Sequence, residues 1–79
     1  MYEWLRETLV NRLGLPADAV RAEATPEEAG LDSLSVTELS MVAQEEWGVV
    51  VHEDDLAACA TVGAMATLLE EHQQRTAAR

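Results

Sequence analysis

The chain has 79 residues and a formal net charge of −10, from 15 acidic and five basic residues. This length allows one domain, residues 1–79, with a small hydrophobic core and no elaborate active site. The excess of acids excludes nucleic acid as a ligand, because binding to a phosphate backbone requires positive charge. The only cysteine, Cys59, excludes an internal disulfide framework and is expected to be a small buried side chain.

Charge is unevenly distributed along the chain. All five basic residues are arginines, and none lies between positions 22 and 74, a stretch that contains twelve acids. A solvated acidic surface is one interpretation, and a binding surface for electropositive partners is the other. Neither a signal-peptide pattern nor an apolar run long enough to span a membrane occurs, so we expect a soluble, cytoplasmic monomer that does not bind membranes.

The first predicted element is an amphipathic helix over residues 2–13, because Leu5, Leu9 and Leu13 recur every four residues. Gly14 and Pro16 are expected to end it. Residues 15–32 show no sustained period and predict a long loop, with one helical turn at residues 25–28 where Thr25-Pro26-Glu27-Glu28 forms a capping-box pattern. A loop this long in so small a domain is usually functional or tightly packed.

A second helix is predicted over residues 33–47, with Gly48 as its stop signal. At about 100° per residue its positions divide into two faces. The predicted core face consists of Val36, Leu39, Ala43 and Trp47. The opposite, solvent face consists of Leu34, Glu38, Met41 and Glu45, which combine two large apolar side chains with two carboxylates.

The remaining elements are short or follow a clear cap. Val49-Val50-Val51 predicts an extended packed linker, because no partner strand is evident. A short helix is expected over residues 53–58, with acids at its N-terminal end. A final helix is expected over residues 61–74, capped by Thr61, with Val62, Met65, Ala66 and Leu69 facing inward and residues 76–79 frayed. The fold class is therefore all-α: a small bundle of three longer helices and one short helix.

Ser33 is the residue with the most chemical interest, within Gly30-Leu31-Asp32-Ser33-Leu34. It would be an ordinary helix N-cap or an exposed hydroxyl that another enzyme modifies, at a helix N-terminus that favours a phosphate group. A catalytic role is disfavoured, since no nucleophile-elbow glycines flank it and the domain is too small for a water-excluding triad. The sequence also lacks the spacings of zinc and calcium sites, so no metal is expected.

From about Thr25 to Glu70 the chain resembles the acyl carrier protein family. The matching stretches are Gly30–Leu34, Thr37-Glu38-Leu39, Glu45–Val51, Glu53-Asp54-Asp55 and Thr61-Val62-Gly63. The resemblance implies a non-catalytic carrier in which Ser33, flanked by Asp32 and Leu34, holds 4'-phosphopantetheine from coenzyme A and carries acyl groups as thioesters.

The resemblance also implies partners. A phosphopantetheinyl transferase would modify Ser33, and acyltransferase, ketosynthase, reductase or dehydratase enzymes would bring basic patches to the face of Leu34, Glu38, Met41 and Glu45. This is the same face that helical periodicity predicts to be exposed.

Some positions differ from the pattern of fatty-acid carriers. Ser35 and Gln44 stand where acids are frequent, and Thr37, Ala43 and Cys59 stand at inward positions where larger aliphatics are usual. We therefore expect a carrier of a polyketide or other specialised pathway with a cleft of altered shape. Two alternatives stay open: a peptidyl or aminoacyl carrier, and a small acidic helical adaptor without a prosthetic group.

Overall fold

The structure is a computed structural model that describes the backbone of residues 1–77 and the side chains of residues 1–74. These residues form α1 (Tyr2–Asn11), α2 (Pro26–Ala29), α3 (Ser33–Trp47), α4 (Glu53–Ala57) and α5 (Val62–Ala77), with no strand among them. The all-α prediction is confirmed, with three longer helices, the short helix α4 and a single turn, α2, in the loop that follows α1.

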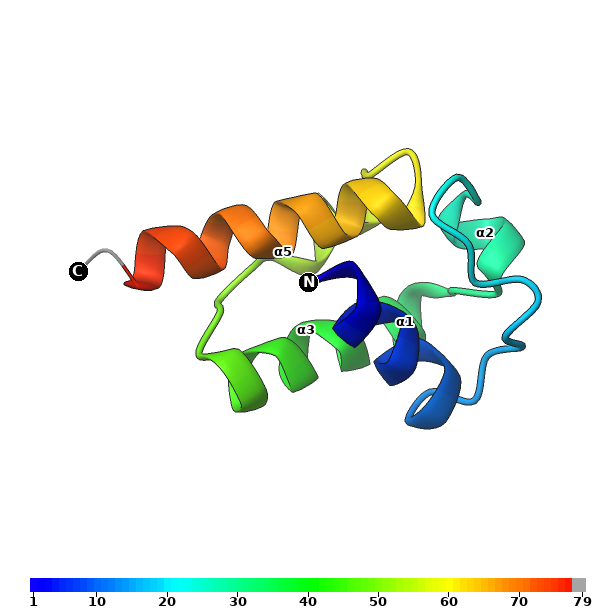
Figure 1. Cartoon of the computed structure of the whole chain (residues 1–79), viewed down its shortest axis with the longest axis horizontal. Helices are drawn as coiled ribbons and strands as arrows, with labels where there is room; N and C mark the ends of the chain where they lie inside the picture. The colour runs from blue at the N-terminus through cyan, green and yellow to red at the C-terminus, as the bar shows by residue number, and fades with distance from the viewer. Residues whose placement is uncertain (78–79) are drawn as a thin grey trace.

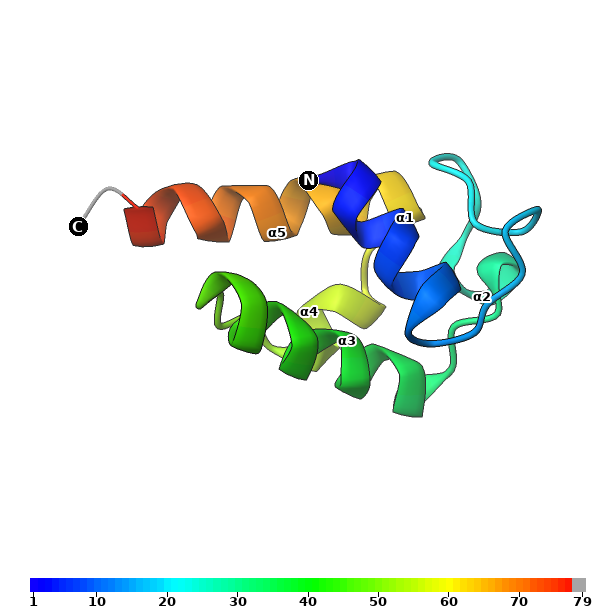
Figure 2. The ribbon, with the colours of Figure 1, turned by 60° about the horizontal axis from the view of Figure 1, so that its bottom comes forward.

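The helices pack as two pairs. α1 contacts α5, and α3 contacts α4. Figure 1 shows α5 as the longest rod along one side, with α3 on the opposite side and α1 in front. In Figure 2, α3 and α4 run side by side below α5 and α1, and the N-terminus lies beside α5 in both views. The start of α3 therefore lies at the end of the molecule near α2 and the long loop.

The hydrophobic core receives side chains from every helix and from the long loop. The predicted inner face of α5 is confirmed, since Val62, Met65, Ala66 and Leu69 are all buried. The largest side chains with no exposed surface are Leu5, Leu9, Leu39, Leu56, Met65 and Leu69. Aliphatic burial on this scale is the main stabilising contribution in a chain without disulfides.

Two helix ends differ from the sequence prediction. α1 ends at Asn11 rather than near Leu13, because the N–H groups of Arg12 and Leu13 both donate to the Thr8 carbonyl, at 2.9 and 3.2 Å. The chain then turns at Gly14 with a φ of 75°. α5 extends through Ala77, beyond the predicted end at residue 74 and into part of the segment predicted to fray, of which residues 78 and 79 lie outside the described residues.

The long loop is tightly packed. Val20 and Ala24 are buried, and the capping box predicted for α2 is present, with reciprocal hydrogen bonds of 3.1 and 2.9 Å between Thr25 and Glu28. The loop also holds the start of α5, because its carbonyls accept the first N–H groups of that helix. These bonds satisfy donors that a helix N-terminus leaves without partners.

Gly63 permits the close approach between the loop and α5. Its N–H donates to the Ala22 carbonyl at 2.9 Å, and a Cβ atom at position 63 would lie only 3.0 Å from that same oxygen. Any larger side chain would therefore push the loop away from the helix.

Trp47 was predicted to lie in the core, and that prediction is wrong. Its side chain is 40% exposed at the end of α3, where it makes an edge-to-face contact with Trp4 at a centroid distance of 5.8 Å. The chain reverses at Gly48, and the buried position is taken by Val49. Glu46 joins this corner to α1, because it accepts a hydrogen bond from the Trp4 indole at 3.1 Å.

The linker after α3 behaves as predicted. Val49 and Val51 are buried, and Val50 between them is exposed. The Ser40 hydroxyl donates to the Val51 carbonyl at 2.8 Å, which fixes this extended segment against α3.

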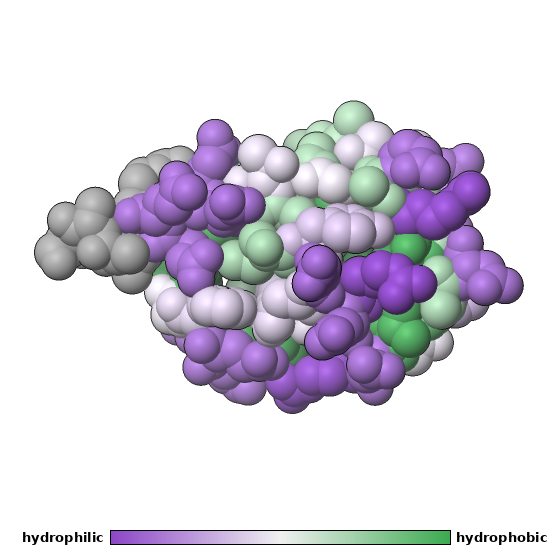
Figure 3. All heavy atoms as spheres, in the orientation of Figure 1, coloured by the Kyte–Doolittle hydropathy of each residue, from purple (hydrophilic) through white to green (hydrophobic). Residues whose placement is uncertain are grey.

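The face of the molecule that carries α1 is largely polar (Figure 3). Figure 3 shows that hydrophilic residues dominate the face that carries α1, with small apolar patches between them. No helix in residues 1–77 is long and apolar enough to cross a membrane.

Candidate functional site at the start of helix α3

Asp32, and not Ser33, is the N-cap of α3. Asp32 has an extended backbone, and its carboxylate accepts a hydrogen bond from the Ser35 N–H at 2.8 Å. This bond satisfies one of the free N–H groups at the helix start. The interpretation of Ser33 as an ordinary cap is therefore wrong, because the preceding aspartate already occupies that position.

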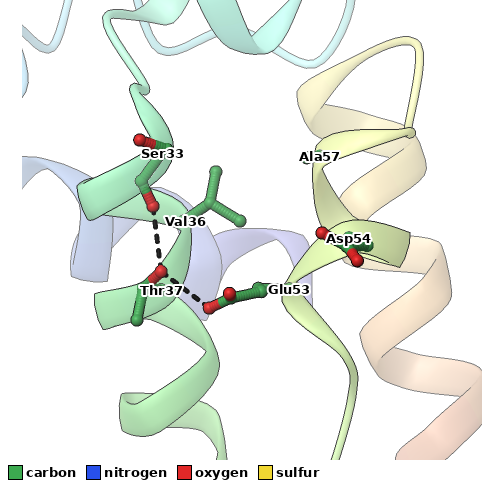
Figure 4. Close-up of a pocket in the computed structure, with 6 residues that line it drawn as sticks. All are labelled: Ser33, Val36, Thr37, Glu53, Asp54 and Ala57. Carbon is green, nitrogen blue, oxygen red and sulfur yellow. Dashed lines mark hydrogen bonds between the residues drawn. The ribbon is translucent and has the colours of Figure 1, made fainter.

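The Ser33 hydroxyl is exposed and makes no hydrogen bond within the described part of the chain. Ser33 is the first residue of α3, and only its backbone carbonyl is engaged, as an acceptor for the Thr37 hydroxyl at 3.0 Å. Figure 4 shows the side-chain oxygen pointing away from that bond. Gly30, with a φ of 93°, makes the turn that brings the chain into this helix.

Ser33 lies between two hollows on the same side of the molecule. One, of about 410 Å³, extends toward α2 and is lined largely by apolar side chains, among them Pro26, Leu31 and Ala57. The other, of about 80 Å³, lies between α3 and α4. Ser33, Val36 and Ala57 line both, so the two hollows adjoin beside Ser33 and are together called the groove.

The smaller hollow is bordered by a polar contact between α3 and α4. The Thr37 hydroxyl lies 2.7 Å from a carboxylate oxygen of Glu53, the first residue of α4 (Figure 4). The Thr37 hydroxyl has one proton and two acceptors within reach, the Ser33 carbonyl at 3.0 Å and the Glu53 carboxylate, and the shorter distance favours the charged carboxylate. Asp54 lines the same hollow.

The predicted solvent face of α3 is exposed. Leu34 is 74% exposed and Met41 is 58% exposed, and Glu38 and Glu45 are also exposed. Neither leucine nor methionine is typical of a surface selected for solubility alone, and apolar groups mixed with charges are typical of protein contact sites.

The electrostatics of the helix start are set by Asp32. The hydrogen bond from the Ser35 N–H holds the pKa of the Asp32 carboxyl below its ordinary value of 3.8. Asp32 is therefore a carboxylate at neutral pH. For Cys59 the direction is opposite, because burial and the neighbouring Asp55 raise the pKa of its thiol, and its Sγ donates to the Asp55 carbonyl at 3.4 Å. Cys59 is half-buried rather than buried.

Comparisons with known proteins identify the family. The family described as "Phosphopantetheine attachment site" matches residues 3–69. Acyl carrier proteins of Nitratidesulfovibrio vulgaris strains DP4 and Hildenborough are each 41% identical over 54 residues, which cover 67% of this chain and 71% of the relative. The acyl carrier protein of strain Miyazaki F is 39% identical over 54 residues, which cover the same shares of the two chains.

This chain belongs to the phosphopantetheine-binding acyl carrier protein family. It is therefore a non-catalytic carrier that bears phosphopantetheine, as the resemblance implied. The membership favours the carrier over the alternative of an adaptor without a prosthetic group.

The start of α3 in this carrier fits a phosphopantetheine group. An exposed, unbonded hydroxyl at the first helical position is available for a phosphodiester, and the helix dipole favours negative charge at this end. The adjacent Asp32 carboxylate opposes that charge, but its hydrogen bond to the Ser35 N–H disperses its own charge into the helix terminus. The groove beside Ser33 would give an arm attached there an apolar surface.

Sequence reasoning missed the contact between Thr37 and Glu53. Thr37 was expected to face inward, and it is half-buried in the groove, but its partner lies 16 residues away on α4. Only the fold brings these side chains together.

Proposed function

We propose that Ser33 is the residue to which 4'-phosphopantetheine is attached, with Asp32 and Leu34 forming its immediate surroundings. The observation that carries this proposal is the division of roles at the start of α3. Asp32 caps the helix, so the Ser33 hydroxyl is free, exposed and beside a groove. Modification of Ser33 therefore removes no hydrogen bond from the fold.

The chain supplies a nucleophilic oxygen and little else to the attachment reaction. The neighbouring carboxylate of Asp32 is engaged by the Ser35 N–H, so the base that takes the hydroxyl proton is expected to come from the phosphopantetheinyl transferase. Once bound, the group supplies a terminal thiol that holds acyl groups as thioesters. The protein then positions the arm and offers a surface to each enzyme in turn.

We propose that the exposed face of α3, formed by Leu34, Glu38, Met41 and Glu45, binds basic patches on the transferase and on acyltransferase, ketosynthase, reductase or dehydratase partners. The exposure of two large apolar side chains between two carboxylates supports this assignment. Carboxylates at the rim of a contact raise the association rate more than the affinity. Such weak, fast contacts suit a carrier that visits several enzymes, acts as a monomer and works in the cytoplasm.

We further propose that the cargo belongs to a polyketide or other specialised pathway rather than to primary fatty-acid synthesis. The hollow between α3 and α4 is only about 80 Å³. A cavity of about 150 Å³ holds a molecule the size of benzene, so the space between α3 and α4 accepts a few atoms and no long alkyl chain, and of the two hollows in the groove only the one of about 410 Å³ toward α2 has room for more. An NMR comparison of saturated-acyl and polyketide-like cargoes that gave identical core shifts would count against this proposal.

A peptidyl or aminoacyl carrier remains the nearest rival, since it would use the same arm with a different cargo. Two features support the acyl version: the aspartate before Ser33, and the acyl carrier proteins among the relatives. Loading assays that compare acyl and aminoacyl donors distinguish the two.

The first experiment is an intact mass measurement before and after incubation with coenzyme A and a promiscuous phosphopantetheinyl transferase. We expect a gain of one phosphopantetheine in the wild type and in Ser35→Ala, and no gain in Ser33→Ala. Ser35 is the matched control because it lies two residues further along the same helix. A gain that persists in Ser33→Ala would show that attachment occurs elsewhere.

A further inference from the structure

The groove that starts at Ser33 is closed between α3 and α4 by one polar contact, and the closure has consequences for the cargo. The Thr37 hydroxyl and the Glu53 carboxylate lie 2.7 Å apart across the two helices. In Figure 4 this pair lies directly below Ser33 and bridges the space that separates α3 from α4. A group that extended from Ser33 along the space between these helices would meet this pair (Figure 4).

We propose that Thr37 and Glu53 form a polar latch that keeps saturated alkyl chains out of the space between α3 and α4 and favours acyl groups with a hydroxyl or keto oxygen near the thioester. This inference rests on the proposed function, since it concerns cargo attached at Ser33. Both residues act on cargo specificity from the groove and not from the partner-binding face of α3.

The chemistry of the latch distinguishes the two kinds of cargo. An alkyl chain that separates the pair places the Glu53 carboxylate beside apolar carbon atoms and leaves the Thr37 hydroxyl only its bond to the Ser33 carbonyl, so the short bond to a charged acceptor is lost without replacement. An oxygenated chain replaces what it breaks, because a cargo hydroxyl donates to the Glu53 carboxylate and a cargo keto oxygen accepts from the Thr37 hydroxyl.

The positions of the two residues also suit a latch. Glu53 is exposed and begins a helix of only five residues, whereas Thr37 is half-buried within a 15-residue helix. One partner is therefore firmly held and the other lies on a short element at the rim of the groove. Behind the rim the two helices bury Leu39 and Leu56, neither of which has exposed surface.

Two substitutions at Thr37 distinguish the effect of its hydrogen bond from the effect of its side-chain shape. Thr37→Val has nearly the same shape without the hydroxyl, and Thr37→Ser keeps the hydroxyl. Glu53→Ala removes the other half of the latch. Asp54→Ala is its matched control, because Asp54 lies in the same helical turn, carries the same charge and lines the same hollow.

The experiment loads each variant with an octanoyl or an acetyl group on the pantetheine arm and compares the methyl NMR shifts of Leu39 and Leu56. In the wild type, Thr37→Ser and Asp54→Ala we expect the two cargoes to give coincident shifts. In Thr37→Val and Glu53→Ala we expect the octanoyl cargo to move both sets of methyl signals and to raise the melting temperature relative to the acetyl form.

A second version of the experiment does not depend on the transferase. Ser33→Cys in a Cys59→Ser background is joined by a disulfide to an octyl or a methyl group, and the same variants and signals are compared. Failure of enzymatic loading would refute the attachment proposal, while this version still tests the latch. Octyl-dependent shifts of equal size with and without the Thr37 hydroxyl, in either version, would overturn the latch.

Discussion

The two faces of α3 lead to a quantitative prediction: the same leucine-to-alanine substitution should change the free energy of unfolding by different amounts on each face. Leu39 has no exposed surface, whereas Leu34, five residues earlier in the same helix, is 74% exposed. Replacement of either residue by alanine removes the same three carbon atoms and leaves a good helix former in place. Any difference in stability between the two variants therefore reports burial alone.

The expected size follows from the exposed fractions. Three buried carbon atoms correspond to about 2.4 kcal/mol at about 0.8 kcal/mol each, and the cavity left behind brings Leu39→Ala to about 3–5 kcal/mol. Leu34 buries only about a quarter of its surface, so Leu34→Ala costs about 0.6 kcal/mol. A domain of this length has a total free energy of unfolding of about 4–12 kcal/mol, so Leu39→Ala removes a large part of it.

Urea unfolding followed by tryptophan fluorescence and far-UV circular dichroism measures both variants, since Trp4 and Trp47 lie at the junction of α1 and α3. We expect a much lower midpoint for Leu39→Ala with an unchanged slope, and a midpoint close to wild type for Leu34→Ala. Where Leu39→Ala does not fold, Leu39→Met gives a milder version of the same comparison. Equal losses in the two variants would refute the assignment of a core face and a contact face.

Three further predictions concern other parts of the chain. Because the folded-state pKa of Asp32 is lowered, its capping bond stabilises the fold above the ordinary value of 3.8 and is lost as the pH falls through the lower folded value. We therefore expect the stability difference between wild type and Asp32→Asn, measured by urea unfolding at several pH values, to shrink below about pH 4, and a constant difference would contradict this. Gly63→Val should destabilise the fold by about 1–3 kcal/mol, because the new Cβ lies 3.0 Å from the Ala22 carbonyl oxygen. Gly63→Ala should cost less, since alanine gains about 1 kcal/mol over glycine in helix propensity, and calorimetry of both variants checks the order. Glu38→Lys should leave the melting temperature unchanged and slow acyl transfer by a cognate partner at low salt, with the difference reduced at high salt, whereas equal low-salt rates would exclude a role for this carboxylate.

The bounds of α3 could be predicted from the sequence because three independent signals agree. Asp32 precedes the helix, a clear helical period begins after Ser33, and Gly48 follows that period with the left-handed backbone that ends the helix. The end of α1 could not be predicted as well. Gly14 and Pro16 show that the helix cannot continue past them, but they do not show at which earlier residue it ends. The sharing of the Thr8 carbonyl by two N–H groups ends the helix earlier.

Trp47 shows that helical periodicity does not predict burial at the end of a helix. It continues the inward series of Val36, Leu39 and Ala43, but the period describes direction around the helix and not distance from the core. The last turn of α3 lies at the edge of the bundle, where the same direction leads to Trp4 and to solvent. Only the packing of α1 beside that turn decides the environment of the side chain.

The Thr37–Glu53 contact was beyond sequence reasoning for a related reason. Its partners are 16 residues apart, and their distance depends on how the Val49–Val51 linker returns α4 to α3. The burial of two valines and the hydrogen bond from Ser40 fix that return. Apolar packing elsewhere in the chain therefore determines the distance between these two polar side chains.

At the start of α3, two adjacent residues have different roles: Asp32 caps the helix, and Ser33 offers an exposed hydroxyl. If Ser33 were the N-cap, esterification of its oxygen would place a bulky phosphodiester on the atom that accepts a helical N–H, and loading would compete with folding. Asp32 removes this conflict, because its carboxylate takes the capping bond and leaves the Ser33 oxygen without a structural role. With attachment at Ser33 as proposed, the helix start would be the same before and after modification, and one surface of α3 would serve both the enzyme that attaches the arm and the enzymes that use it.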